Sequence, residues 1–376
     1  MIYKLKDLFE LQMGKTPSRH NADYWGGNNK WISIADIGNA NKYIENTKEC
    51  ISDKAVAESG IKKVPKGTVI MSFKLSIGKT TITTEDMFTN EAIMAFIDKG
   101  ICPIDTDYLY HFCCGKDWLA GTNKAVMGLT LNKATLSEIK ISVPNIEIQR
   151  EIALKLDKID ELIGMRRKEL DMLIQLVKSR FIEMFGDVKT GDYKFETQKL
   201  GKVADVGSSH RVFTTEFVEK GIPFYRGTEI GELANGIKPE NPYRITKEHY
   251  ERLACDETKP KIGDLLMPSI CNKGQIWMVD TDEPFYYKDG RVLCISPNRN
   301  LFNCKYLEQF MREKTLVEYP KLGSGSTFAE FKIFLLKEID VLIPPIELQN
   351  QFATFVEQVD KSKYHGEFTY EMEVAA

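Results

Sequence analysis

The side chains that could take part in chemistry are basic, amide, aromatic and hydroxyl groups on predicted turns between strands. Such groups bind the phosphates and base edges of nucleic acids. In the first half of the chain the candidates are Lys15, Ser18, Arg19, His20, Lys74, Ser76, Lys79 and Thr80. In the second half they are Ser208, His210, Arg211, Tyr225, Arg226, Lys273, Gln275 and Arg291. A single loop lysine is usually only solvated, so the prediction concerns the two sets as groups.

Motifs for catalysis are incomplete. Gly78-Lys79-Thr80 resembles the end of a phosphate-binding loop, but Phe73 stands where that loop needs a glycine, which favours a simple turn. Asn241-Pro-Tyr243 resembles part of the peptide with which amino-methyltransferases hold a flipped base, yet no glycine-rich cofactor loop precedes it. The histidines never fall into metal-ligand spacing. We therefore predict no catalytic residue, no metal site and no cofactor of the chain's own.

The composition is that of an ordinary protein of two or three domains, with 376 residues, 43% hydrophobic and 28% charged. A net charge of −3 argues against indiscriminate coating of nucleic acid, although a local basic face remains compatible with it. Eight scattered cysteines without a CxxC pair fit a reducing compartment. No apolar run is long enough for a membrane span, and the start lacks a signal-peptide core. We expect a cytoplasmic protein.

These loops must be positioned by the rest of the chain, whose most distinctive element is a predicted helix over residues 149–185, free of proline. Its apolar residues recur every 3.5 residues on average, which keeps one narrow seam facing a partner helix, as in a coiled coil. Arg166 and Arg180 fill the two missing steps of this repeat. The seam positions are Ile152, Leu156, Ile159, Ile163, Leu170, Leu173 and Val177, with Met184 near the end.

An internal repeat explains this helix. The sequence SVPNIEIQ at 142–149 is answered by LIPPIELQ at 342–349, and the seam continues in register behind each copy. Proline before the first helical turn is favourable because its missing N–H would have no partner there. In the second copy Phe352, Val356 and Val359 stand where the first has Ile152, Leu156 and Ile159. The repeat predicts two similar domains, each followed by its own helix.

The predicted fold class is α+β, with two similar mixed α/β domains separated by long coiled-coil helices. The domains are residues 1–146 and 187–345, the spacer helix is 147–186, and a shorter second helix with a tail is 346–376. Short strands bounded by turns recur in the same order in both domains. The loops differ, however: residues 127–130 correspond in position to residues 323–327, and the two sequences are not similar. Related scaffolds with different loops suit two different targets.

The tail breaks the symmetry, since no seam residue follows Lys363 and Gly366 comes soon after. We expect the second helix to span only about twenty residues. Most of the first helix would then lack a partner within the chain, which leaves it open to a second copy as a homodimer.

Taken together, these features resemble the specificity subunit of type I restriction-modification systems. The resemblance rests on the repeat, on VPNIEIQREI at 143–152 with IPPIELQ at 343–349, on GKTPS at 14–18, on GTVI at 67–70 and on FIEMFGD at 181–187. It implies two target-recognition domains that each read half of a bipartite DNA site, with the helices paired antiparallel between them. It also implies a noncatalytic subunit that recruits methylation (M) and restriction (R) subunits. S-adenosylmethionine, ATP and Mg would bind those partners, which methylate adenine N6 and cleave DNA.

Two alternatives remain open at this point. The specificity subunit of a related system, in which nuclease and methylase share one polypeptide, would have a similar sequence. A coiled-coil adaptor whose two heads bind proteins would share the repeat without DNA specificity. Seam residues such as Leu156 are also compatible with simple helix packing, which is commoner than direct contact with a partner protein.

Overall fold

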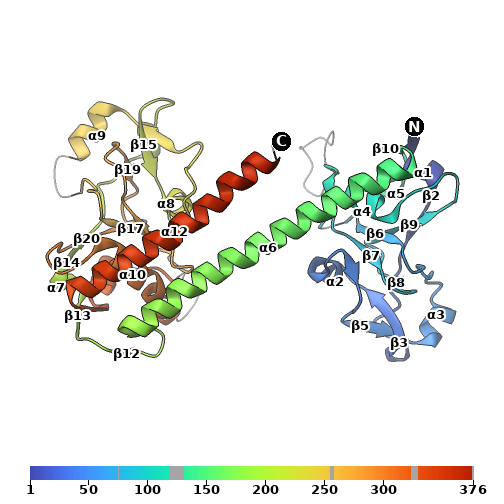
Figure 1. Ribbon diagram of the computed structural model, residues 1–376, viewed down its shortest axis with the longest axis horizontal. Coiled ribbons are helices and arrows are strands. Elements are labelled where there is room, and N and C mark those ends of the chain that lie inside the picture. Colours follow the sequence, from blue (N-terminus) through green and yellow to red (C-terminus); the bar gives the residue numbers. More distant parts are fainter. Residues whose placement is uncertain (75, 119–130, 255–257, 323–328, 375–376) are drawn as a thin grey trace. The chain divides into compact units, whose positions relative to one another are not determined.

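The computed structural model describes residues 1–74, 76–118, 131–254, 258–322 and 329–374, with the backbone alone from 364 onward. The chain forms two compact units, Met1–Met165 and Arg166–Ala376, called unit 1 and unit 2 below (Figure 1). Both mix helices with small sheets, which confirms the predicted fold class. Among the described residues, no helix is both long and apolar enough to cross a membrane.

Unit 1 is built on a sheet with the strand order β2-β9-β6-β7-β4. A second sheet has the order β5-β3-β8, and β1 pairs with β10. The strands are β1 (Ile2–Lys4), β2 (Phe9–Met13), β3 (Trp25–Ile32), β4 (Tyr43–Ile44), β5 (Glu49–Ile51), β6 (Val69–Ser72), β7 (Thr80–Thr83), β8 (Phe88–Thr89), β9 (Ile93–Asp98) and β10 (Lys140–Ser142). The helices are α1 (Leu5–Leu8), η1 (Ala22–Tyr24), α2 (Ile34–Asn39), α3 (Asp53–Glu58), α4 (Thr106–Gly115) and α5 (Lys133–Ser137).

Unit 2 repeats this topology, except that among its described residues the larger sheet has no counterpart of β4. Its larger sheet has the order β14-β20-β17-β18, its smaller sheet has the order β16-β15-β19, and β13 pairs with β21. The strands are β11 (Gly186–Asp187), β12 (Asp192–Tyr193), β13 (Thr197–Lys199), β14 (Ala204–Gly207), β15 (Ile222–Tyr225), β16 (Tyr243–Ile245), β17 (Leu265–Pro268), β18 (Trp277–Met278), β19 (Tyr286–Tyr287), β20 (Val292–Pro297) and β21 (Asp340–Leu342). The helices are α7 (Leu200–Val203), η2 (Thr214–Glu216), α8 (Gly227–Leu233), α9 (Lys247–Leu253), α10 (Cys304–Glu318), η3 (Tyr319–Leu322) and α11 (Ile333–Lys337).

The smaller sheets repeat even the strand directions. In unit 1, β3 pairs antiparallel with β5 and parallel with β8. In unit 2, β15 pairs antiparallel with β16 and parallel with β19. Mixed three-stranded sheets of the same order and directions at the same point of each half are the structural counterpart of the repeat in the sequence.

The core strands are buried on both faces, and their side chains alternate between two clusters. In β6, Val69 and Met71 join the cluster that contains Leu5. Ile70, between them, packs with Ile93 on the opposite face. The equivalent strand β17 behaves alike, because Leu265 and Met267 face one cluster and Leu266 faces another. This is the period of two that strands impose on their side chains.

The long helix α6 (Ile146–Phe185) confirms the prediction for 149–185 and begins one turn earlier. Its second half packs in unit 2 against α12 (Ile346–Val374), with the rings of Phe181 and Phe352 5.4 Å apart. Further along, Arg166 donates to the carbonyl of Lys363 at 2.5 Å. Because the residue numbers rise along one helix as they fall along the other, the two segments run antiparallel.

One prediction for the C-terminal helix is wrong. The backbone of α12 spans 29 residues, from Ile346 to Val374, and continues through Gly366. A glycine within a helix costs only about 1 kcal/mol relative to alanine. That cost is small for a helix anchored at its start, so the glycine does not end it.

Candidate nucleic-acid interface

Strand pairing in unit 1 brings the predicted loops to one edge of the larger sheet. β2 ends at Met13 opposite Met94, and β6 ends beside the start of β9, with Ser72 opposite Ile93. Met71 of β6 also pairs with Thr80, the first residue of β7. The connections that leave and enter these strand ends therefore lie together. We call residues 14–24, 73–79 (residue 75 apart) and 90–92 the loop edge of unit 1.

The unit 1 candidates lie on this loop edge or at its border. Lys15, Ser18, Arg19, His20, Ser76 and Lys79 are exposed, and Lys74 and Thr80 are half-buried. The Thr80 hydroxyl donates to the carbonyl of Gly78 at 3.0 Å, and the Ser76 carbonyl accepts from the hydroxyl of Ser72. The structure thus gathers residues that are up to 65 positions apart in the sequence, from Lys15 to Thr80.

Arg19 is already engaged within the unit. Its two terminal nitrogens donate to the Glu49 carboxylate at 2.5 and 2.8 Å, and its guanidinium carbon lies 3.6 Å from the ring centre of Trp25. The hydrogen bonds raise the pKa of Arg19 and lower that of Glu49. A guanidinium shared with a carboxylate attracts phosphate less than a solvated lysine does, so Lys15 and Lys79 are the stronger phosphate candidates.

A small hollow of about 380 Å³ adjoins Lys79, lined by Ile77, Gly78, Lys79, Cys114, Lys116, Asp117 and Trp118. Gly78 has φ +89°, and a Cβ there would meet the Trp118 ring at 3.0 Å, so the position suits glycine alone. Its N–H donates to the carbonyl of Ser72, as in a turn between strands. Lys116 brings a second ammonium group to this hollow and was not among the sequence candidates, because it follows a helix rather than a predicted turn.

The same edge exists in unit 2. β14 ends at Gly207 opposite Cys294, and β17 ends at Pro268 opposite Val292. The loop edge of unit 2 accordingly comprises residues 208–213, 269–276 and 288–291. Several candidates here support the loops themselves. Ser208 donates to the carbonyl of Val292 and accepts from the N–H of Gly290, and the N–H of His210 donates to the hydroxyl of Tyr286.

The other unit 2 candidates differ in what their side chains contact. Arg211 is exposed and lies 5.6 Å from the ring centre of Phe213. Lys273 is exposed, and its N–H donates to the side chain of Gln275 at 3.0 Å. Arg291 is 57% exposed and forms an ion pair with Glu330 at 2.6 Å.

Tyr225 packs in the core against Trp277 and Phe285, and burial raises its pKa. It therefore supports the loop edge from beneath rather than presenting its hydroxyl as a solvated group.

Arg226, like Arg19 in unit 1, is held by a carboxylate and an aromatic ring. Its Nη2 donates to Glu229 at 2.5 Å and its Nε at 3.2 Å, while its guanidinium carbon lies 4.6 Å from the ring centre of Tyr243. Glu229 is buried, which by itself raises its pKa, but hydrogen bonds from Arg226 lower the pKa below its ordinary value. The carboxylate is thus ionised and holds the guanidinium in place.

The predicted loops at 127–130 and 323–327 lie outside the described residues. In the described part of the chain, no group of three or more His, Cys, Asp or Glu residues could hold a metal ion.

The predicted seam divides into two parts. In α6, Ile152, Leu156 and Ile159 are 37, 36 and 39% exposed. The half-buried positions Ile163, Leu170 and Leu173 follow, and Val177 is buried. On α12, Phe352, Val356 and Val359 are all buried in the unit 2 core. The second half of the seam is therefore helix packing, and the first half presents an apolar surface.

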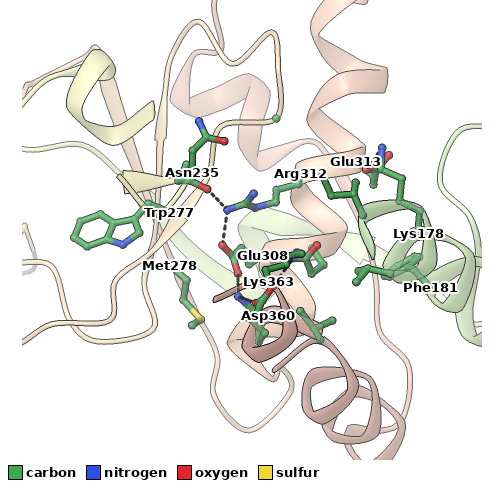
Figure 2. A pocket seen from close by; sticks show the side chains of 18 of the residues that line it. Lys178, Phe181, Asn235, Trp277, Met278, Glu308, Arg312, Glu313, Asp360 and Lys363 are labelled. Atoms are coloured by element: carbon green, nitrogen blue, oxygen red, sulfur yellow. Dashed lines mark hydrogen bonds and ion pairs between the residues drawn. The ribbon is translucent and has the colours of Figure 1, made fainter. Parts of the chain in front are cut away.

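A groove of about 790 Å³ follows the buried part of this seam in unit 2, between α6, α10, α12 and the end of α8 (Figure 2). Its polar side chains are largely paired. Arg312 Nη2 donates to Glu308 and to the carbonyls of Ala234 and Ile276 at 2.7–2.9 Å. Lys363 donates a hydrogen bond to the Asp360 carboxylate at 2.9 Å. The Arg312 contacts attach α10 to the residues beside α8 and β18, and Lys305 of α10 joins α12 through Asp360 at 3.2 Å, so the set resembles structural bracing more than a reactive site.

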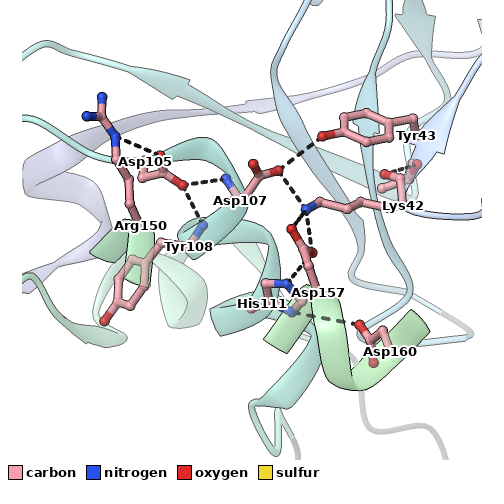
Figure 3. A network of polar contacts seen from close by, with 10 residues as sticks. Lys42, Tyr43, Asp105, Asp107, Tyr108, His111, Arg150, Asp157 and Asp160 are labelled. Carbon is pink, nitrogen blue, oxygen red and sulfur yellow. Dashed lines mark hydrogen bonds and ion pairs between the residues drawn. The ribbon is translucent and has the colours of Figure 1, made fainter. Parts of the chain in front are cut away.

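Unit 1 fixes the first turns of α6 by a different network, which the sequence analysis missed (Figure 3). Lys42 lies 2.5 Å from Asp157 of α6 and 2.9 Å from Asp107 of α4, and His111 contacts the same Asp157 at 2.8 Å. Burial by itself raises the pKa of Asp157, but the contacts with Lys42 and His111 lower it. Asp157 occupies a polar position of the helical repeat, which reads as solvated surface in the sequence alone.

Both helix starts are fastened by equivalent buried glutamines. Gln149 accepts from the N–H of Asp105 at 2.9 Å and donates to the carbonyls of Pro103 and Pro144. Gln349 repeats this set with Asn303, Leu301 and Pro344. Both glutamines are completely buried. The repeated motif in the sequence thus encodes the anchor of each helix to its own unit.

Comparison with known proteins agrees with this architecture. Residues 1–173 match the family described as the Type I restriction modification DNA specificity domain. The type I restriction enzyme MjaIX specificity subunit of Methanocaldococcus jannaschii is 25% identical over 95% of this chain and 85% of its own length. The first 173 residues thus match the specificity domain of type I restriction-modification systems, and nearly the whole chain is similar to a specificity subunit of such a system.

Other specificity subunits show the same likeness. The EcoR124I/EcoR124II specificity subunit of Escherichia coli is 27% identical over 49% of this chain and 46% of its own length. The crystal structure of the S subunit from M. genitalium has a TM-score of 0.52 at 15% identity, covering 100% of this chain and 93% of that one. A chain from a study of complex assembly in a type I R-M system reaches 0.60 with the same identity and coverage. The structural likeness concerns the fold.

Proposed function

We propose that this chain is the DNA-recognition subunit of a type I restriction-modification complex and that each unit reads one half of a bipartite site. The observation that carries the proposal is the pair of loop edges. The same strand pairing brings basic and polar side chains together at the same edge of both larger sheets, but the side chains differ. Equivalent scaffolds with unlike surfaces are what two unlike half-sites require.

Phosphate contacts and base contacts would come from different residues. Exposed lysines such as Lys15, Lys79 and Lys273 are suited to phosphates, which position the protein and make its affinity depend on salt. Side chains held in one orientation are suited to base edges, where each bidentate pair of side chain and base discriminates against the wrong base by roughly 1–3 kcal/mol.

The continuous helix α6 would set the gap between the two half-sites. Its 40 residues correspond to a rise of roughly 60 Å. The duplex rises about 3.4 Å per base pair, so a rigid helix of fixed length favours one spacing.

Chemistry would be left to partner subunits. The chain would direct adenine-N6 methylation by M subunits and restriction by R subunits, with S-adenosylmethionine, ATP and Mg bound by those partners. The exposed apolar residues of α6, such as Leu154 (69% exposed) and Met165 (51%), offer a surface that a methylation subunit could cover. The same apolar surface of α6 would also suit a contact with a second copy of the chain or with another protein.

A gel-shift titration across salt concentrations, with the methylation subunit present, tests the proposal. DNA recognition predicts a steep fall in affinity as salt rises, together with preference for one bipartite duplex over a scrambled one. Binding that is insensitive to salt, shows no duplex preference and depends only on the protein partner would support the adaptor function and reject this proposal.

A further inference from the structure

Arg226 and Arg19 are both held by a carboxylate and an aromatic ring, but Glu49 occupies both terminal nitrogens of Arg19, whereas Glu229 occupies only Nε and Nη2 of Arg226. Arg226 precedes the first turn of α8, directly after β15. A Cβ added at its neighbour Gly227 would lie 3.1 Å from Pro268 and 4.0 Å from the carbonyl of Arg291. Pro268 ends β17 and Arg291 precedes β20, so Arg226 stands at the border of the loop edge of unit 2.

Three contacts fix the direction of this side chain. Glu229 accepts from Nε and Nη2 and also from the backbone N–H of Arg226, at 2.8 Å. The ring of Tyr243 lies against the guanidinium, and this ring stacks in turn on Phe217, with centroids 4.6 Å apart. Because little rotational freedom remains to be lost on binding, donors held in this way discriminate more sharply than those of a free side chain.

The unused donors form one edge of the guanidinium. Glu229 occupies the edge made by Nε and Nη2, which leaves Nη1 and the second hydrogen of Nη2 side by side. Among the described residues, none accepts a hydrogen bond from Nη1. Two parallel N–H donors match the O6 and N7 acceptors that guanine presents in the major groove.

The Glu229 carboxylate makes a base a better ligand for Arg226 than a phosphate. Glu229 lies 2.5 Å from Nη2 and its side chain is only 6% exposed, so it offsets the charge that would attract an anionic phosphate. It leaves the hydrogen bonds to a neutral guanine edge intact. We propose that Arg226 reads a guanine in the half-site recognised by unit 2, with Glu229 and Tyr243 as the residues that position it.

Unit 1 places other side chains at the equivalent positions. Ser33 is the N-cap of α2, the helix after β3, and its hydroxyl donates to Asp36. Glu49 pairs with Trp31 where Tyr243 pairs with Phe224 in unit 2. The contact should therefore be specific to one half-site.

This inference rests on the proposed function, and methylation sequencing tests it. The chain and its methylation subunit are expressed in cells, and the methylated motif is compared between the wild type and Arg226→Gln. We expect one G·C pair in one half-site to become degenerate, with discrimination falling about 5- to 150-fold. The other half-site and the gap should be unchanged. An unchanged motif, or altered preference in both halves, would overturn the assignment.

Two further variants separate reading from folding. Arg244→Gln removes a positive charge from the same small sheet, where Arg244 contacts the carbonyl of Gly221, and should leave the motif unchanged. Loss of the same G·C preference in this control would refute a specific role for Arg226.

Glu229→Gln keeps an acceptor for the helix start but removes the charge that opposes phosphate binding. It should weaken the G·C preference while steepening the salt dependence of DNA binding by about 0.9 in log–log slope, the value for one added phosphate contact. An unchanged slope with full discrimination would refute the positioning role of Glu229. A wild-type complex that neither binds nor methylates DNA would instead reject the proposed function itself.

Discussion

Replacing Gln349 by leucine should destabilise unit 2 and leave unit 1 intact. The side chain of Gln349 is completely buried and makes three hydrogen bonds of 2.8–2.9 Å, to the N–H of Asn303 and the carbonyls of Leu301 and Pro344. Leucine has a similar size but no polar atoms. The substitution would leave one donor and two acceptors without this partner.

The size of the effect follows from those three groups. An unsatisfied buried polar group costs about 1–3 kcal/mol, and carbonyls with a second partner cost less. The added apolar burial offsets about 1 kcal/mol. We therefore expect a loss of about 3 kcal/mol, which for an m value of about 2–3 kcal/mol/M moves the urea midpoint of unit 2 down by about 1 M.

The assay must resolve the two units, because a chain of two domains need not unfold in one step. Hydrogen-exchange mass spectrometry across a urea series reports each unit through its own peptides. Gln351→Leu makes the same chemical change at an exposed position of the same helix and should change the free energy of unfolding by less than about 0.5 kcal/mol. A Gln349→Leu protein as stable as this control, or one in which unit 1 is equally weakened, would refute the anchoring role.

Three other predictions concern the helix, the polar network and the loop edge. Inserting four helix-forming residues after Gly164 lengthens α6 by about 6 Å, so methylation sequencing should show a gap longer by about one or two base pairs with both half-sites kept; an unchanged gap would contradict the spacer role. Asp157→Asn should destabilise unit 1 at neutral pH. Because the pKa of Asp157 in the folded state lies below the ordinary value of 3.8, its contribution to stability is present above that value and is lost as the pH falls through the folded-state pKa. The difference in unfolding free energy between wild type and variant, measured by urea titration, should therefore shrink in acid and not in base. Lys79→Ala should weaken DNA binding without changing the motif and reduce the salt slope by about 1, whereas an altered motif would mean that Lys79 reads bases.

The large-scale organisation could be predicted from the sequence because it follows from local patterns. The 3.5-residue spacing predicts α6, and the recurring PNIEIQ and PPIELQ segments predict two equivalent helix starts. The reason for the glutamine in both could not be predicted. Gln149 bonds to backbone groups of residues 103 and 105, and only the folded chain brings those groups to it.

The candidate loop residues were predictable as a group but not in their individual roles. Arg19 and Arg291 pair with Glu49 and Glu330, which lie 30 and 39 positions away, so the sequence offers no local sign of these ion pairs. Arg226 and Glu229 are only three positions apart, and that spacing could have indicated a pair. Lys42, His111 and Asp157 come together only through the packing of three separate elements.

The central claim is that two equivalent units read two different half-sites at a fixed separation. Sequencing the methylated adenines in cells that carry this chain with its methylation subunit tests it most directly. We expect two short, unlike specific sequences separated by a gap of constant length. A single uninterrupted motif, or methylation without sequence preference, would contradict it.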